Sequence, residues 1–152
     1  MNRILITLLL GISLSPFAAA DEWNADQQNL WEFVAASWED DTQKSGKWPG
    51  DYVDDGALTW DADWPVPRDM DSMARWTKFR DKRTEVLAYE LFPHDVIVNG
   101  DTGVVFYSVV EVRQLSDDSV ERSVSGIVET AVRSGKTWKY VALTSFEMQA
   151  DD

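Results

Sequence analysis

Three long runs of strand-forming residues in the second half of the chain constrain the fold more than any other feature. They cover residues 103–115, 120–133 and 137–148. The segments between them, Ser116–Ser119 and Ser134–Lys136, have the length and the Ser, Asp and Gly content of β-hairpin turns. The sequence therefore predicts an antiparallel meander built from these runs.

A further extended segment precedes this meander. Residues 86–92 are rich in large apolar side chains, and the pattern resumes over residues 95–98 before the turn at Asn99–Asp101. Pro93 lies between the two pieces and cannot donate a backbone hydrogen bond to a neighbouring strand. We therefore expect Pro93 to interrupt this part of the sheet.

Two segments in the first half have the periodicity of amphipathic helices. They cover residues 24–43 and 72–82, and in each the apolar side chains recur at intervals of three and four. Asp69 or Asp71 can cap the second helix, because a carboxylate accepts hydrogen bonds from the free N–H groups of the first turn. The apolar faces consist of Leu30, Trp31, Val34 and Trp38 in the first segment and of Met73, Trp76 and Phe79 in the second.

The chain between the two helices is predicted to contain a short strand. Residues 52–56 look like a helical turn that leads into a strand over residues 57–61, and the prolines of Trp64–Pro67 require an extended loop. The order is then helix, short strand, helix and meander. This order predicts an α+β fold in which the N-terminal helices cover one face of a strongly curved antiparallel sheet.

The first 20 residues have the features of a secretory signal peptide. Asn2 and Arg3 precede an apolar run over residues 4–14, and Ala18–Ala20 supplies a small-residue cleavage motif. The apolar run is shorter than the roughly 20 residues that span a bilayer. We therefore expect cleavage after Ala20, a single domain over residues 21–152, and a periplasmic or secreted protein.

The composition excludes several kinds of site and partner. With one histidine and no cysteine, the chain can form no disulfide or cysteine-based zinc site and has too few imidazoles for a typical transition-metal site. Its net charge of −13 opposes contact with nucleic acid or an anionic membrane unless a basic patch overcomes it. We therefore expect no metal, no cofactor, no nucleic acid and, after cleavage, no membrane partner. The basic cluster, expected to be a solvated face, is Arg75, Lys78, Arg80, Lys82 and Arg83.

Short motifs in the chain resemble those of one known superfamily. Residues 135–141, Gly-Lys-Thr-Trp-Lys-Tyr-Val, resemble the strand that closes nuclear-transport-factor-2-like domains. Residues 99–105 resemble a strand opening of the same domains, and the Tyr-x-Asp-Asp turn at Tyr52–Asp55 is also similar. The resemblance implies a cone, in which a bent sheet wraps around helices and a pocket opens between them. It also implies a homodimer that pairs through the convex face of the sheet.

Catalytic residues are suggested by the isomerases of this superfamily, although its fold also hosts other enzymes and proteins that only bind or dimerise. The isomerase pattern places a general base at Asp61, but this chain has no tyrosine on the first helix and no acid near Ser125 to complete the oxyanion hole. Asp61 is therefore a candidate base, with a solvated loop carboxylate as the alternative. His94 is a second candidate because histidine titrates near neutral pH, with a surface histidine as the alternative.

Five of the eight tryptophans lie on elements that line the pocket in this superfamily. An indole ring is a rigid apolar surface with one N–H donor, and therefore suits a flat or apolar ligand. The alternative is core packing of the helix faces. The predicted pocket residues are Trp31, Trp38, Tyr52, Trp60, Trp64, Trp76, Tyr140 and Thr144.

Different classes of function remain open. The first is an exported protein that binds a small apolar or aromatic molecule in this pocket. The second is a cofactor-independent isomerase, cyclase or hydrolase that uses Asp61 as its base. The third is a homodimeric assembly protein without a ligand.

Overall fold

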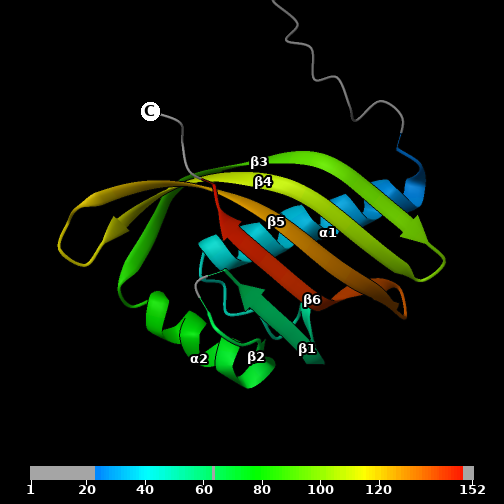
Figure 1. Cartoon of the computed structure of the whole chain (residues 1–152), viewed down its shortest axis with the longest axis horizontal. Helices are drawn as coiled ribbons and strands as arrows, with labels where there is room; N and C mark the ends of the chain where they lie inside the picture. The colour runs from blue at the N-terminus through cyan, green and yellow to red at the C-terminus, as the bar shows by residue number, and fades with distance from the viewer. Residues whose placement is uncertain (1–22, 63, 149–152) are drawn as a thin grey trace, which may run out of the picture.

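The computed structural model describes residues 23–62 and 64–148 and shows an α+β fold (Figure 1). The predicted signal peptide and its cleavage site lie outside these residues. Helix α1 covers Ala25–Thr42 and helix α2 covers Met70–Arg80. The strands are β1 (Val53–Asp61), β2 (Arg68–Asp69), β3 (Thr84–Asn99), β4 (Thr102–Leu115), β5 (Val120–Ser134) and β6 (Thr137–Glu147). They form a six-stranded sheet in the order β2-β1-β6-β5-β4-β3.

Strands β3 to β6 form the antiparallel meander that the hairpin turns predict. Beyond β6 the pairing changes, because β1 runs parallel to β6 and the two-residue strand β2 pairs with β1. The sheet is therefore mixed rather than wholly antiparallel. A parallel partner comes from a distant part of the chain, so no hairpin turn in the sequence signals it.

Helix α1 lies across one face of the sheet (Figure 1), which we call the inner face, and buries Leu30, Val34 and Ser37. Asn24 begins the helix with a capping box, in which its side chain accepts from the backbone N–H of Gln27 at 3.1 Å. The close approach of α1 requires Gly103 on β4, because a Cβ atom there would lie 2.2 Å from Leu30 Cδ2. Helix and sheet together enclose the core.

Pro93 does not interrupt β3, which continues from Thr84 to Asn99. The pairing of β3 with β4 shifts between Pro93 and Asp95, which is a β-bulge. Because β3 is the edge strand, Pro93 can lack its N–H group without loss of pairing. The predicted interruption is therefore wrong, and a local bulge accommodates the proline.

Other element boundaries also differ from the sequence prediction. Strand β1 already begins at Val53, where a helical turn was expected, and its register shifts between Val53 and Leu58. Strand β2 was not predicted. Helix α2 begins at Met70, and Asp69 is its cap, since its side chain accepts from the backbone N–H of Ser72 at 2.8 Å. No helix in residues 23–62 and 64–148 is long and apolar enough to cross a membrane.

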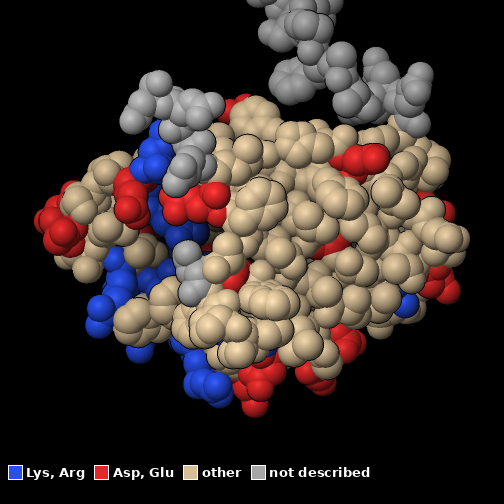
Figure 2. Space-filling model, in the orientation of Figure 1, with Lys and Arg blue, Asp and Glu red and all other residues tan. Residues whose placement is uncertain are grey.

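The opposite face of the sheet, which we call the outer face, carries exposed apolar side chains. Trp60 of β1 and Thr144 of β6 are paired on this face, and Phe146 lies over Gly126 of β5. Figure 2 shows a broad area over the middle of the sheet with few charged side chains. The exposed apolar residues on this face include Leu58, Trp60, Phe92, Ile97 and Phe146.

Candidate functional site

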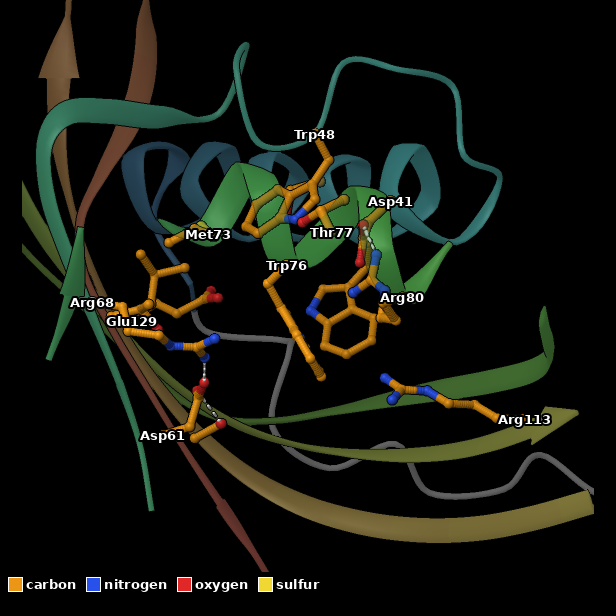
Figure 3. Close-up of a pocket in the computed structure, with 15 residues that line it drawn as sticks. Asp41, Trp48, Asp61, Arg68, Met73, Trp76, Thr77, Arg80, Arg113 and Glu129 are labelled. Atoms are coloured by element: carbon orange, nitrogen blue, oxygen red, sulfur yellow. Dashed lines mark hydrogen bonds and ion pairs between the residues drawn. The ribbon is translucent and has the colours of Figure 1, made fainter. Parts of the chain in front are cut away.

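A cavity of about 260 Å³ lies between α1, α2 and the inner face of the sheet (Figure 3). This volume is close to the lower end of the range found for small-molecule sites. Each of the elements around it contributes side chains. The lining residues are Ser37, Trp38, Asp41, Trp48, Thr59, Asp61, Arg68, Met73, Trp76, Thr77, Arg80, Arg113, Glu129, Leu143 and Ser145.

Strand alternation decides which residues of β1 and β6 line the cavity. Asp61 is paired with Ser145, and both side chains line it. The neighbouring pair, Trp60 and Thr144, points to the outer face because successive side chains of a strand alternate. The predicted pocket residues Trp60 and Thr144 therefore lie outside this cavity.

The aromatic part of the cavity comes from Trp38, Trp48 and Trp76. Trp38 and Trp76 were predicted from the helix faces. Trp48 was not, because it follows the end of α1 in an irregular segment where no periodicity marks its direction. Met73 and Leu143 add apolar surface beside the rings.

The other predicted aromatic residues lie elsewhere. Trp31 packs against Tyr107, with ring centroids 5.7 Å apart, and does not line the cavity. Trp64 packs on the outside of Trp76 at 6.4 Å. The Tyr52 hydroxyl donates to the Asp40 carboxylate and ties its loop to α1. Burial, followed by this hydrogen bond, raises the pKa of Tyr52 to about 12.

The cavity is more polar than the tryptophan count predicts, because arginine–carboxylate pairs lie along it (Figure 3). Arg80 of α2 pairs with Asp41 of α1, and Arg113 of β4 pairs with Glu111 of the same strand. Burial raises the pKa of Asp41, although Arg80 opposes the shift. A ligand in this space would therefore meet polar groups as well as rings.

Asp61, the predicted base, lines the cavity in an ion pair with Arg68 of β2. Its other oxygen accepts from Ser145 Oγ at 2.7 Å. Both carboxylate oxygens of Asp61 are therefore engaged by neighbouring side chains of the protein. This arrangement suits a structural role that holds Arg68 in place.

Glu129 of β5 is a carboxyl at this site that the motif search missed. It is only 6% exposed and lines the cavity from the inner face. Its Oε2 atom is buried and has no hydrogen-bond partner within 3.5 Å among the described residues. Burial raises the pKa of Glu129 to about 7, although interactions with the hydroxyls of Tyr140 and Tyr107 lower it. The carboxyl is therefore near the midpoint of its titration at neutral pH.

A buried hydrogen-bond network surrounds Glu129. Trp38 Nε1 donates to the Tyr107 hydroxyl at 2.7 Å. The Tyr140 hydroxyl and Ser37 Oγ are 3.1 Å apart, and Ser37 Oγ donates to the Val34 carbonyl at 2.8 Å. Because Ser37 gives its one proton to the Val34 carbonyl, the Tyr140 hydroxyl donates to Ser37 Oγ. Tyr140, a predicted pocket residue, therefore lies one layer behind the cavity wall.

The signal for Glu129 is present in the sequence. Strand alternation from Ile127 through Glu129 to Ala131 places all three on the same face, and both apolar neighbours are buried. A charged residue at the inward position of a strand is rare unless it is paired or functional. The isomerase pattern points instead to Ser125, four residues earlier on the same strand.

His94 lies away from the cavity, on the outer side of the β3 bulge. Its Nε2 is 2.6 Å from Ser108 Oγ. Asp95 accepts from the backbone N–H of Val96 and does not orient His94. Among the described residues no group of His, Asp or Glu side chains is arranged to hold a metal ion.

Comparison with solved structures shows the fold. A conserved protein from Planctomyces limnophilus matches with a TM-score of 0.74 and 9% identity, over 82% of this chain and 97% of the other. A ketosteroid isomerase-like protein from Erwinia carotovora atroseptica matches with a TM-score of 0.73 and 9% identity, over 84% and 100%. An NTF2-like protein of unknown function from Prochlorococcus marinus matches with a TM-score of 0.68 and 11% identity, over 85% and 97%.

These similarities identify an α+β fold in which helices cover one face of a curved sheet. The chain has the nuclear-transport-factor-2-like fold, as its strand motifs predicted. At such low identity the likeness extends to the fold alone. No family model and no curated protein sequence matches the chain.

Proposed function

We propose that this protein binds a small molecule with a flat apolar or aromatic body and one polar group that bonds to Glu129. The rings of Trp38, Trp48 and Trp76 would contact the body of the ligand. Small-molecule sites are usually lined by aromatic and other apolar side chains with a few polar groups that orient the ligand. The polar wall limits the ligands to molecules that are not purely hydrocarbon.

The nearly buried carboxyl of Glu129 in the cavity wall, opposite the tryptophan rings, is the observation that carries this proposal. A buried polar atom without a partner costs free energy, so native structures rarely retain one. A ligand hydroxyl or carbonyl would supply a partner to the part of the Glu129 carboxyl that lines the cavity. The carboxyl can serve either partner, because with a pKa of about 7 it is both donor and acceptor near neutral pH.

Calorimetric titration with 2-naphthol and naphthalene tests the proposal. We expect wild-type protein to bind 2-naphthol about tenfold more tightly, as one buried hydrogen bond allows. Glu129→Met should abolish the preference, whereas the control Glu121→Met, on the exposed part of the same strand, should retain it. Failure of both compounds to bind, or an unchanged preference in Glu129→Met, would overturn the proposal.

A second candidate function is proton transfer catalysed by Glu129. A general base is most effective when its pKa is near the working pH, and the pKa of Glu129 of about 7 meets this condition. The ion pair with Arg68 makes Asp61 the weaker candidate. Hydrogen–deuterium exchange beside the carbonyl of 2-tetralone, followed by NMR, tests this function. The rate should rise with pH to a plateau above about 7, vanish in Glu129→Gln and persist in Asp61→Asn.

We further propose that the protein is exported and acts as a homodimer. The Ala18–Ala20 motif supports export. The largely apolar outer face of the sheet supports pairing of two copies, because monomers rarely expose large contiguous apolar areas. N-terminal sequencing of the mature protein would test the cleavage site, with Asp21 as the expected first residue.

A further inference from the structure

The exposed side of α2 and the loop before it carry three aromatic rings in a row. Trp64, Trp76 and Phe79 are 41%, 43% and 45% exposed. The centroids of Trp64 and Trp76 are 6.4 Å apart, and those of Trp76 and Phe79 are 5.4 Å apart. Val66, in the same loop as Trp64, is 60% exposed. We call Trp64, Trp76 and Phe79 the aromatic row.

The basic cluster of the protein lies beside the aromatic row. Figure 2 shows Lys and Arg side chains gathered at the end of the molecule where Figure 1 draws α2. The guanidinium of Arg83 lies 4.2 Å above the Phe79 ring, so charge and ring form one surface. The exposed carboxylates of Asp69 and Asp71 lie at the N-terminal end of α2, whereas Lys82 and Arg83 follow its C-terminal end, so the positive charge is concentrated at that end. The exposed basic residues are Arg75, Lys78, Lys82 and Arg83.

The net charge of −13 does not cancel this local field. Salt screens charges beyond about 8 Å at physiological ionic strength. A surface that touches only the α2 side therefore meets the basic cluster rather than the net charge. The sequence-based expectation of no membrane partner depended on the net charge. In the structure the charged side chains are unevenly distributed, and Lys and Arg gather near α2.

We propose that the aromatic row and the basic cluster dock this protein on an anionic lipid bilayer. Indole and phenyl rings prefer the region of the lipid headgroups, and Lys and Arg side chains bind lipid phosphates. Trp76 belongs to the aromatic row and also lines the cavity. Docking therefore places the cavity close to the bilayer, from which apolar molecules can enter. This inference goes beyond the ligand proposal and does not require it.

The ring geometry favours lipid over single-stranded nucleic acid. Bases bind such proteins by stacking on open ring faces. Here Arg68 covers a face of Trp64 at 4.2 Å, Arg83 covers a face of Phe79, and Trp76 and Phe79 stack on one another. The exposed edges that remain suit insertion among headgroups better than stacking.

Co-sedimentation with vesicles of phosphatidylglycerol or phosphatidylcholine tests the docking. We expect binding to the anionic vesicles alone, falling about tenfold between low and high salt. Lys78→Glu should weaken binding several-fold, while Lys136→Glu, the same charge change on the distant β5–β6 turn, should not. Phe79→Ser should weaken it as well, whereas Ile97→Ser on β3 should not.

Several outcomes would overturn the docking proposal. They are equal binding to both vesicle types, equal loss in Lys78→Glu and Lys136→Glu, and displacement of the protein from vesicles by a single-stranded oligonucleotide. Circular dichroism of each variant separates loss of binding from loss of fold. Because Glu129→Met disables only the proposed ligand contact, it should still bind vesicles, so the two proposals can fail independently.

Discussion

Asp61 of β1 and Arg68 of β2 form an ion pair beside the cavity, and each partner also contacts a third side chain. Ser145 Oγ donates to Asp61 at 2.7 Å, and the Trp64 ring lies 4.2 Å from the Arg68 guanidinium. The pair therefore connects β1, β2, β6 and the loop at the cavity mouth. Both oxygens of Asp61, the candidate base, are therefore engaged within the fold.

Asp61→Asn should destabilise the protein by about 2 kcal/mol, less than the loss for a fully buried pair because Asp61 is 30% exposed. The amide leaves the buried Arg68 guanidinium without a counter-charge, and Arg68 Nε already lacks a partner among the described residues. Urea denaturation measures the change. The exposed control Asp55→Asn on the same strand should change stability by less than about 0.5 kcal/mol. Equal losses in the two variants would contradict the structural role of the pair.

The raised pKa of Glu129 predicts a pH-dependent stability. Its pKa rises from 4.5 to about 7 on folding, so between these values the folded protein binds more protons than the unfolded chain. Stability should therefore fall as pH rises from about 4.5 to 7 and then level off, a loss of about 3 kcal/mol from this group.

Glu129→Gln should remove this loss, because the amide does not titrate. Urea denaturation at pH 5 and pH 8 should show the variant gaining stability relative to wild type as pH rises. Glu121→Gln, at an exposed position of the same strand, is the matched control and should follow the wild-type curve. A wild-type curve without this slope would mean that folding does not raise the pKa of Glu129.

Local chemistry explains why the sheet was predictable. The meander is encoded by turns that join neighbouring strands, such as Ser116–Ser119, and each turn acts within a few residues. Strand β2 escaped prediction because two residues carry no periodicity, and the parallel partner of β6 because it lies far along the chain. The effect of Pro93 on β3 was predicted wrongly because it depends on whether β3 is an edge strand. Only the complete sheet shows which strand lies at the edge.

The candidate site was less predictable than the sheet. Trp38 and Asp61 line the cavity, as the sequence suggested. Trp60 points to the other face of the sheet, because neighbouring side chains on a strand alternate between the two faces. Glu129 gains its chemistry from burial, which depends on elements from both halves of the chain. The arginine pairs Arg80–Asp41 and Arg68–Asp61 likewise join residues from different elements, so composition alone underestimates the polarity of the cavity.

Gly103→Ala should destabilise the protein by about 1 kcal/mol or more, since overpacking a core forces side chains to move. The new Cβ would lie 2.2 Å from Leu30 Cδ2, and Leu30 is completely buried. Gly126→Ala is the control, because its Cβ would meet the half-exposed ring of Phe146, which can turn outward. Thermal denaturation should show a clear loss for Gly103→Ala and little change for Gly126→Ala. The same loss at both positions would show that outer-face packing matters as much as the contact with α1.

Phe146→Asp should convert the proposed homodimer into a monomer. Phe146 is 46% exposed on the outer face of β6. In a two-fold symmetric pair each substitution appears on both copies, so a carboxylate would enter the apolar contact from each side. Light scattering at micromolar concentration should give twice the chain mass for wild type and the chain mass for the variant. Val120→Asp, at an exposed position beside the β4–β5 turn, should remain dimeric. A monomeric wild-type protein, or a Phe146→Asp variant that still pairs, would rule out pairing through this face.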